Sequence, residues 1–207
     1  NSDADWSASN DLLVVARLSV PFSCDKGFLW ATKFFSEKKG DIPQSKIRFC
    51  GAGNGQALIK KFADKNNMLD SIDARGYVDQ ETLVSIYNDS SCLLIPSMME
   101  AGCTAVIEAV MCGCLPIALD SAGLAEIMES VGLDEYLLPG KPKKLASSIE
   151  MIVPIDENVV DLLSRLNTNQ NQVRQDLERA RQIALEKFSL SATTSRLIKI
   201  IKETEFA

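Results

Sequence analysis

The sequence predicts an α/β fold, in which a Rossmann-like parallel β-sheet is flanked by helices. Short apolar runs are typical of strands covered on both faces; they occur at Leu12–Ala16, Cys92–Ile95 and Leu115–Leu119. Between such runs, apolar residues recur three and four positions apart, as in amphipathic helices. The alternation of the two patterns indicates βαβ units, whose crossover is right-handed in nearly all proteins.

Composition limits the classes of protein that fit. The chain has 207 residues, 22 basic and 28 acidic, with a net charge of −6, which argues against a broad nucleic-acid surface. No apolar run is long enough for a transmembrane helix. The start, Asn1–Asp5, is polar and acidic, unlike a signal peptide. Six cysteines lie mostly within apolar patterns, which favours a reduced, cytoplasmic setting.

We divide the chain into three parts: a polar tail over residues 1–10, a Rossmann-like domain over 11–155 and a helical extension over 156–207. Within the domain we expect a last strand at Glu135–Leu138 and a helix at Leu145–Ile152. Because the chain begins without methionine, we expect it to be a piece of a larger protein.

The central stretch of the chain joins the strand at Cys92–Ile95 to a helix expected from about Gly102 to Met111. Glu100 falls in the connecting loop, at the carboxyl end of a strand, where ligands collect in parallel sheets. Small residues at Gly102, Cys103 and Thr104 leave the first helical amides open to an anion such as phosphate.

A second carboxylate, Glu108, follows Glu100 by eight residues and is expected about two turns inside that helix. A carboxylate accepts hydrogen bonds from two neighbouring hydroxyls, so Glu108 suits a polyol such as ribose. The alternative is an ordinary α/β crossover, which also has small residues at its turn and a glutamate on its solvent side.

The stretch from Glu100 to Glu108 resembles the E-x7-E motif of retaining glycosyltransferases of the GT-B fold, family 4. Its continuation to Met128 resembles that family's glutamate, small-residue, Gly-x-Pro, Gly-x-x-Glu pattern. The resemblance covers about residues 11 to 203 but only half of a GT-B enzyme. It implies the donor-binding half, with an acceptor-binding domain upstream or on another chain. The absence of histidine agrees with this division, because the histidine that assists catalysis in the family belongs to the acceptor-binding half.

Two basic residues are assigned to a diphosphate. Arg17 directly follows the first strand and Lys26 opens the next helix. Arginine offers a planar fork that matches phosphate oxygens, and lysine a mobile point charge. Ala16–Leu18 and Lys26–Gly27 resemble the family's Gly-Arg-Leu and Lys-Gly signature, whose Arg and Lys hold the donor phosphates, although Ala16 replaces the usual glycine. The alternative is that both are solvated loop charges.

Two further turns belong to the expected donor pocket. Gly51 and Gly53 follow a strand, but their G-x-G-x-G spacing differs from the dinucleotide fingerprint and disfavours a nicotinamide-dependent oxidoreductase. The resemblance implies that this turn lines the donor pocket, and a purely conformational role is the alternative. Arg75, Gly76 and Tyr77 resemble the family's turn beside the nucleotide base.

The predicted activity is transfer of a sugar from a nucleoside-diphosphate sugar to an acceptor with retention, of the hexosyltransferase type. The resemblance implies Arg17, Lys26 and Glu100 as catalytic residues. The donor-binding set is Gly51, Gly53, Arg75, Gly76, Tyr77, Gly102, Cys103, Thr104 and Glu108.

Neither a metal nor a cofactor is expected to take part. Fixed positive groups can stabilise the diphosphate, and the one DxD sequence, Asp3–Asp5, stands in the terminal tail. The cysteines lack zinc-site spacing. The expected partners are the donor and the acceptor-binding domain, and membrane contact stays open. The alternative function is a nucleotide-sugar-binding module without catalytic activity of its own.

Overall fold

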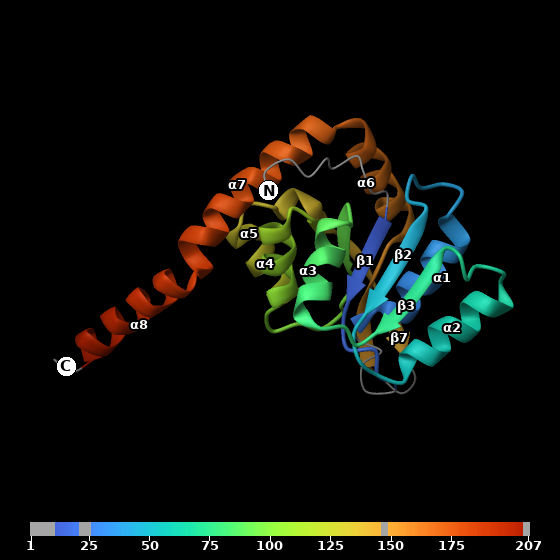
Figure 1. Ribbon diagram of the computed structural model, residues 1–207, viewed down its shortest axis with the longest axis horizontal. Helices are drawn as coiled ribbons and strands as arrows, with labels where there is room; N and C mark the ends of the chain where they lie inside the picture. Colours follow the sequence, from blue (N-terminus) through green and yellow to red (C-terminus); the bar gives the residue numbers. More distant parts are fainter. Residues whose placement is uncertain (1–10, 21–25, 146–148, 205–207) are drawn as a thin grey trace.

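The structure, a computed structural model, describes residues 11–20, 26–145 and 149–204. The polar tail predicted for residues 1–10 lies outside the described residues. The described residues form a Rossmann-like body and the helices that follow it (Figure 1).

A six-stranded parallel sheet forms the centre of the molecule, in the order β3-β2-β1-β4-β5-β6. Its strands are β1 (Asp11–Val15), β2 (Lys46–Cys50), β3 (Ile72–Gly76), β4 (Cys92–Ile95), β5 (Leu115–Leu119) and β6 (Leu137–Leu138). The order reverses between β1 and β4, and the carboxyl ends of strands at such a switch point form a crevice. The predicted α/β, Rossmann-like fold is confirmed.

Helices cover both faces of this sheet. The helices are α1 (Phe28–Lys38), α2 (Gly55–Lys65), α3 (Gln80–Asn88), α4 (Thr104–Cys112) and α5 (Ala122–Ser130). Figure 1 shows α1 and α2 together on one side of the strands and α3, α4 and α5 on the other. The change of side follows from right-handed crossovers, because the chain crosses back over the sheet after β3.

The core is built from the residue types that the periodic patterns predicted. Every residue of β4 and β5 is buried, as expected for strands covered on both faces. The cysteines in this core are free thiols. Burial raises the pKa of Cys50 to about 11 and that of Cys92 to about 12, so both stay neutral and behave as small apolar residues.

A β-hairpin replaces the helix expected at Leu145–Ile152, and that prediction was wrong. Strands β7 (Gly140–Leu145) and β8 (Ile149–Pro154) pair antiparallel. The segment carries the β-branched residues Ile149, Ile152 and Val153, which favour a strand over a helix. The strand expected from Glu135 begins only at Leu137, after the short 3-10 helix η2 (Asp134–Tyr136).

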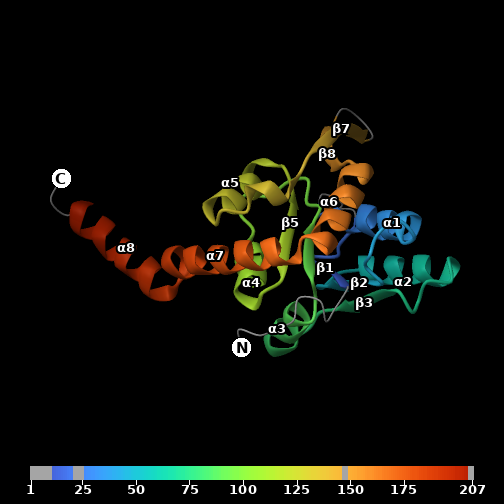
Figure 2. The same ribbon diagram turned by 90° about the horizontal axis from the view of Figure 1, so that it is seen from above.

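Three helices complete the described chain: α6 (Asp156–Thr168), α7 (Gln170–Phe188) and α8 (Leu190–Thr204). Helix α7 packs against α4, and Figure 2 shows α8 extending away from the rest of the molecule. A buried carboxylate fixes α7 in place. Asp176 is 0% exposed and accepts hydrogen bonds from the Tyr136 hydroxyl at 2.7 Å, Arg179 Nη2 at 2.7 Å and Gln172 Nε2 at 3.0 Å.

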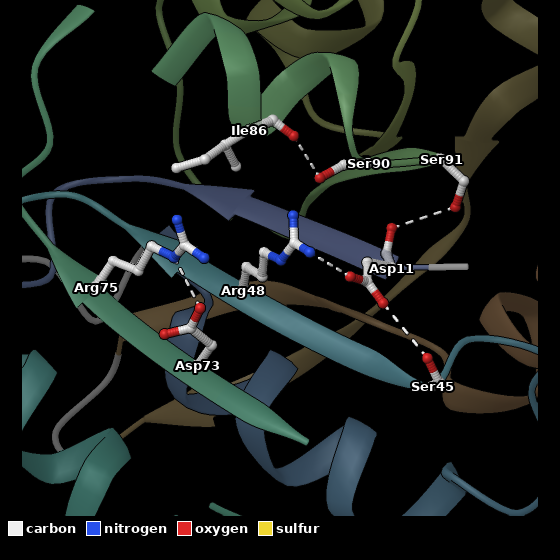
Figure 3. A network of polar contacts seen from close by, with 8 residues as sticks. All are labelled: Asp11, Ser45, Arg48, Asp73, Arg75, Ile86, Ser90 and Ser91. Atoms are coloured by element: carbon white, nitrogen blue, oxygen red, sulfur yellow. Dashed lines mark hydrogen bonds and ion pairs between the residues drawn. The ribbon is translucent and has the colours of Figure 1, made fainter. Parts of the chain in front are cut away.

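Ion pairs support the β1-β2-β3 edge of the sheet. Arg48 Nη2 lies 2.6 Å from Asp11 Oδ2, and Arg75 Nε lies 2.7 Å from Asp73 Oδ2. Figure 3 shows both arginine side chains on the side of the strands that carries Ile86. Arg75 therefore pairs with Asp73, a residue of its own strand β3.

Candidate functional site

A cavity of about 550 Å³ opens at the carboxyl ends of β1 and β4, at the switch point of the sheet. The last residues of both strands form its floor, and the loops after β1, β2, β3 and β4 form its walls. This is the place where α/β sheets of this kind bind ligands.

The cavity brings together most of the predicted site residues. Its wall includes Arg17, Lys26, Gly51, Tyr77, Glu100, Gly102, Cys103, Thr104 and Glu108. Gly53, Arg75 and Gly76 are not among the residues that line it. Their roles, like those of the lining residues, stay predictions about ligand binding.

Gly51 and Gly53 have a conformational role in the structure. Their φ angles are 140° and 144°, which side-chain-bearing residues rarely adopt. A Cβ at Gly51 would lie 1.8 Å from the Ala16 carbonyl oxygen, and one at Gly53 would lie 2.1 Å from that of Leu18. The glycines thus let the loop after β2 approach the segment that carries Arg17.

The start of α4 faces the same cavity. Cys103 is the extended residue before the helix, and none of the side chains that the structure describes caps the first turn. The positive end of the helix dipole is therefore available to an anion at Gly102, Cys103 and Thr104. Burial, and then the Glu100 carboxylate, raise the pKa of the Cys103 thiol, so no thiolate competes for this position.

The two predicted phosphate ligands differ in their surroundings. Lys26 Nζ lies 2.6 Å from Glu100 Oε1, and the two side chains are only 19% and 14% exposed. Arg17 is exposed, and its side chain forms no ion pair or hydrogen bond with any residue that the structure describes. Arg17 is the more accessible cation of the pair, whereas Lys26 shares its charge with a carboxylate.

Glu108 lies on the cavity side of α4, four residues after the first residue of the helix. This is about one turn inside the helix, and not the two turns expected. Its Oε2 accepts a hydrogen bond from the hydroxyl of Tyr87 at 3.1 Å. Sequence reasoning missed Tyr87 because a tyrosine on the apolar side of a helix has the pattern of an ordinary core residue.

A glycine of the next helix supports the loop that carries Glu100. Gly123 lies in the first turn of α5, and a Cβ there would lie 2.4 Å from the Glu100 carbonyl oxygen. Gly123 is the glycine of the Gly-x-x-Glu part of the family resemblance, Gly123–Glu126. In the structure, the absence of a side chain lets α5 pack against the Glu100 loop.

Two features are absent from the described part of the chain. Among the side chains that the structure describes, no three or more His, Cys, Asp or Glu are grouped so that they could hold a metal ion. Over residues 11–20, 26–145 and 149–204, no helix has the length and apolar character needed to cross a membrane.

The fold is that of one half of a GT-B glycosyltransferase. The pneumococcal O-GlcNAc transferase GtfA, solved with UDP and GlcNAc, matches 95% of this chain over 36% of its own, with a TM-score of 0.69 and 18% identity. Sucrose-phosphate synthase from Thermosynechococcus elongatus matches 98% over 46% of its own chain, with a TM-score of 0.72 and 20% identity. HepE of Anabaena, solved with UDP, matches 96% over 50%, with a TM-score of 0.69 and 14% identity.

At these identities the likeness shows the fold alone. The chain spans between about a third and a half of the length of these proteins. No curated protein matches the chain in sequence. The family model for glycosyl transferases group 1, however, matches residues 9–171. This match covers most of the sequence, and the chain therefore belongs to the glycosyl transferases group 1 family.

Proposed function

We propose that this chain is the donor-binding half of a retaining, family 4 glycosyltransferase of the hexosyltransferase type. One observation carries the proposal: Arg17, Lys26, Glu100 and Glu108 line a single cavity together with the start of α4. A volume of about 550 Å³ lies in the range of small-molecule sites, about 300–1,000 Å³. That two proteins of the same fold were solved with UDP supports a nucleoside diphosphate as the ligand.

Each group in the cavity has a proposed partner on the donor. Arg17, Lys26 and the amides at the start of α4 bind the diphosphate. Glu108 binds the ribose hydroxyls and Glu100 those of the transferred sugar. Tyr77, which is 79% exposed at the wall of the cavity, lies beside the base.

The same groups account for the chemistry. When the bond between the sugar and the diphosphate breaks, negative charge develops on the β-phosphate. Fixed cations and helix amides stabilise that charge without reorganising, which is usually the largest contribution to catalysis of this type. We propose that the reaction needs no metal, since Arg17, Lys26 and the α4 amides supply the positive charge.

The acceptor is proposed to bind a second domain, which lies upstream on the same chain or on another chain. The enzyme is proposed to act in the cytoplasm. The chain alone is expected to bind the donor without transferring the sugar. A nucleotide-sugar-binding module without catalytic activity is the other candidate. The two differ in one measurement: only the glycosyltransferase transfers labelled sugar when the acceptor-binding half is supplied.

Calorimetry of the whole chain with UDP, GDP and ADP tests the proposal. We expect one of them to bind, and Glu108→Ala to weaken that binding by about 1–3 kcal/mol, because charge-assisted hydrogen bonds to the ribose are lost. Glu129→Ala, at an exposed glutamate of α5, is the matched control and should bind as the unaltered chain does. No binding of any of the three at millimolar concentration would refute the proposal.

Arg17→Ala distinguishes a phosphate ligand from a structural arginine. Because Arg17 is exposed, the variant should fold normally. We expect at least a tenfold loss of affinity for UDP and no change for uridine, which lacks the phosphates; one charge-assisted hydrogen bond is worth about 1.5–3 kcal/mol. Lys65→Ala, at an exposed residue of α2, should change neither. Equal losses for UDP and uridine would exclude Arg17 from phosphate binding.

A further inference from the structure

The contact between Tyr87 and Glu108 joins a core residue to the wall of the cavity. Tyr87 comes from α3 and is 1% exposed, whereas Glu108 comes from α4 and is exposed at the cavity. The Tyr87 hydroxyl donates to Glu108 Oε2 at 3.1 Å. Because buried hydroxyl groups are nearly always hydrogen-bonded, this contact satisfies the tyrosine and at the same time restrains the glutamate.

We propose that Tyr87 is a positioning residue that holds the Glu108 carboxylate ready for the two adjacent hydroxyls of a ribose. This inference rests on the proposed function and extends it from the residues that touch the ligand to one that does not. Tyr87 occupies Oε2 and leaves Oε1, with its full capacity to accept hydrogen bonds, for the ligand.

The tyrosine is a constant donor. Burial, followed by the nearby Glu108 charge, raises the pKa of Tyr87 far above its ordinary value. The phenol therefore keeps its proton across the working range of pH. A phenol has one proton and a carboxylate only accepts, so the direction of the hydrogen bond is fixed.

Restraint of Glu108 matters because a free glutamate side chain samples several rotamers. Binding of a ligand that immobilises such a side chain costs conformational entropy. This cost is smaller when the side chain is already held in place. The benefit appears only for ligands that use the glutamate. A merely structural tyrosine would instead affect all ligands equally, through the stability of the fold.

Tyr87→Phe, which keeps the ring and removes the hydroxyl, provides the test. Affinities of the whole chain for UDP and for 2′,3′-dideoxy-UDP are measured by calorimetry, with GDP or ADP and their dideoxy forms used instead if one of those is the nucleotide that binds. We expect three- to tenfold weaker binding of UDP and an unchanged affinity for the dideoxy form. In the Glu108→Ala background, Tyr87→Phe should have no further effect.

Tyr136→Phe is the matched control, because it removes another buried hydroxyl that donates to a carboxylate, and neither Tyr136 nor its partner Asp176 lines the cavity. It should lower the Tm and leave both affinities unchanged. Equal weakening of UDP and dideoxy-UDP by Tyr87→Phe would make Tyr87 a structural residue and overturn the inference. If Tyr87→Phe binds UDP with unchanged affinity while Glu108→Ala binds it more weakly, the inference is overturned and the proposed function stands. Failure of the unaltered chain to bind any nucleotide would refute both.

A second measurement does not depend on the folding of Tyr87→Phe. The chain has three tyrosines, so 3-fluorotyrosine labelling gives few fluorine signals. Tyr77→Phe and Tyr136→Phe assign the remaining one to Tyr87. We expect UDP to shift this signal and dideoxy-UDP to leave it in place, and identical shifts with both would count against the inference.

Discussion

At the scale of single residues, the ion pair between Lys26 and Glu100 competes with the proposed ligand. Lys26 Nζ lies 2.6 Å from Glu100 Oε1. A phosphate oxygen that binds Lys26 must replace or share this carboxylate. A sugar hydroxyl, in contrast, can donate to Glu100 while the pair persists. Glu100 is therefore expected to weaken binding of the diphosphate and to strengthen binding of the sugar.

Glu100→Gln should separate these two effects. Without the carboxylate charge, Lys26 is held less strongly, so we expect the affinity for UDP to rise about two- to fivefold; the gain stays below the about 1.5–3 kcal/mol of a charge-assisted hydrogen bond, because the introduced amide oxygen still accepts from Lys26. The additional affinity of UDP-glucose over UDP should be lost. Calorimetry with both ligands measures this. Glu37→Gln, which alters the exposed Lys33–Glu37 pair at 3.6 Å, is the control. Weaker UDP binding by Glu100→Gln would contradict the competition.

The sequence was informative about which charged residues gather at the cavity and silent about their pairing. Arg17, Glu100 and Glu108 were found because each follows a strand or lies in a recognisable motif. The contacts from Lys26 to Glu100 and from Tyr87 to Glu108 bridge 74 and 21 positions of sequence. Such pairs depend on how strands and helices pack, which local patterns do not contain.

At the scale of elements, hydrophobic periodicity predicted the strands and helices around the cavity. The apolar runs of β1, β4 and β5 and the helical spacing of α4 were clear because these elements are buried. The segment that forms the β7–β8 hairpin was predicted as a helix instead. Strand β7, with the sequence GKPKKL, has no apolar run, so the pattern of this two-stranded hairpin outside the main sheet is weaker.

Gly123→Val tests the contact between α5 and the Glu100 loop. A Cβ at Gly123 would lie 2.4 Å from the Glu100 carbonyl oxygen, so the larger residue must displace the loop. We expect a loss of stability of about 1–3 kcal/mol, typical of overpacking, together with weaker binding of UDP-glucose. Thermal unfolding and calorimetry measure the two effects. At Gly40 a Cβ would meet nothing within 4 Å, so Gly40→Val serves as the control. A Gly123→Val variant as stable as the Gly40→Val control would disprove the contact.

At the scale of the whole molecule, the position of the cavity follows from the strand order, because ligand sites of such sheets form where the order reverses. The sequence predicted a ligand site at the carboxyl ends of parallel strands, but it did not predict the strand order or the switch point between β1 and β4. The position of α8 was not predicted either. Its sequence predicts a helix with an apolar side, but Leu190, Leu197 and Ile198 remain exposed in the structure.

Ending the chain at Ser189 tests whether α8 belongs to the folded body. Figures 1 and 2 show α8 extending away from the sheet and the cavity. We therefore expect the shortened chain to bind UDP with unchanged affinity, and its Tm to change little. Ending the chain at Asn169 instead removes α7, with its buried Asp176, and should unfold the domain. Loss of UDP binding on removal of α8 alone would show that the helix supports the cavity.

Because α8 extends away from the rest of the molecule, a small change of its angle displaces its far end by several ångströms. Its 15 residues extend over about 22 Å at about 1.5 Å per residue, so a tilt of about 10° at its base moves the far end by about 4 Å. Small rotations of this domain against the acceptor-binding domain of the proposed function would be magnified there. With that domain supplied, a fluorescent dye at residue 199, paired with one on the acceptor-binding domain, is expected to report such a rotation as a change in energy transfer when the donor binds.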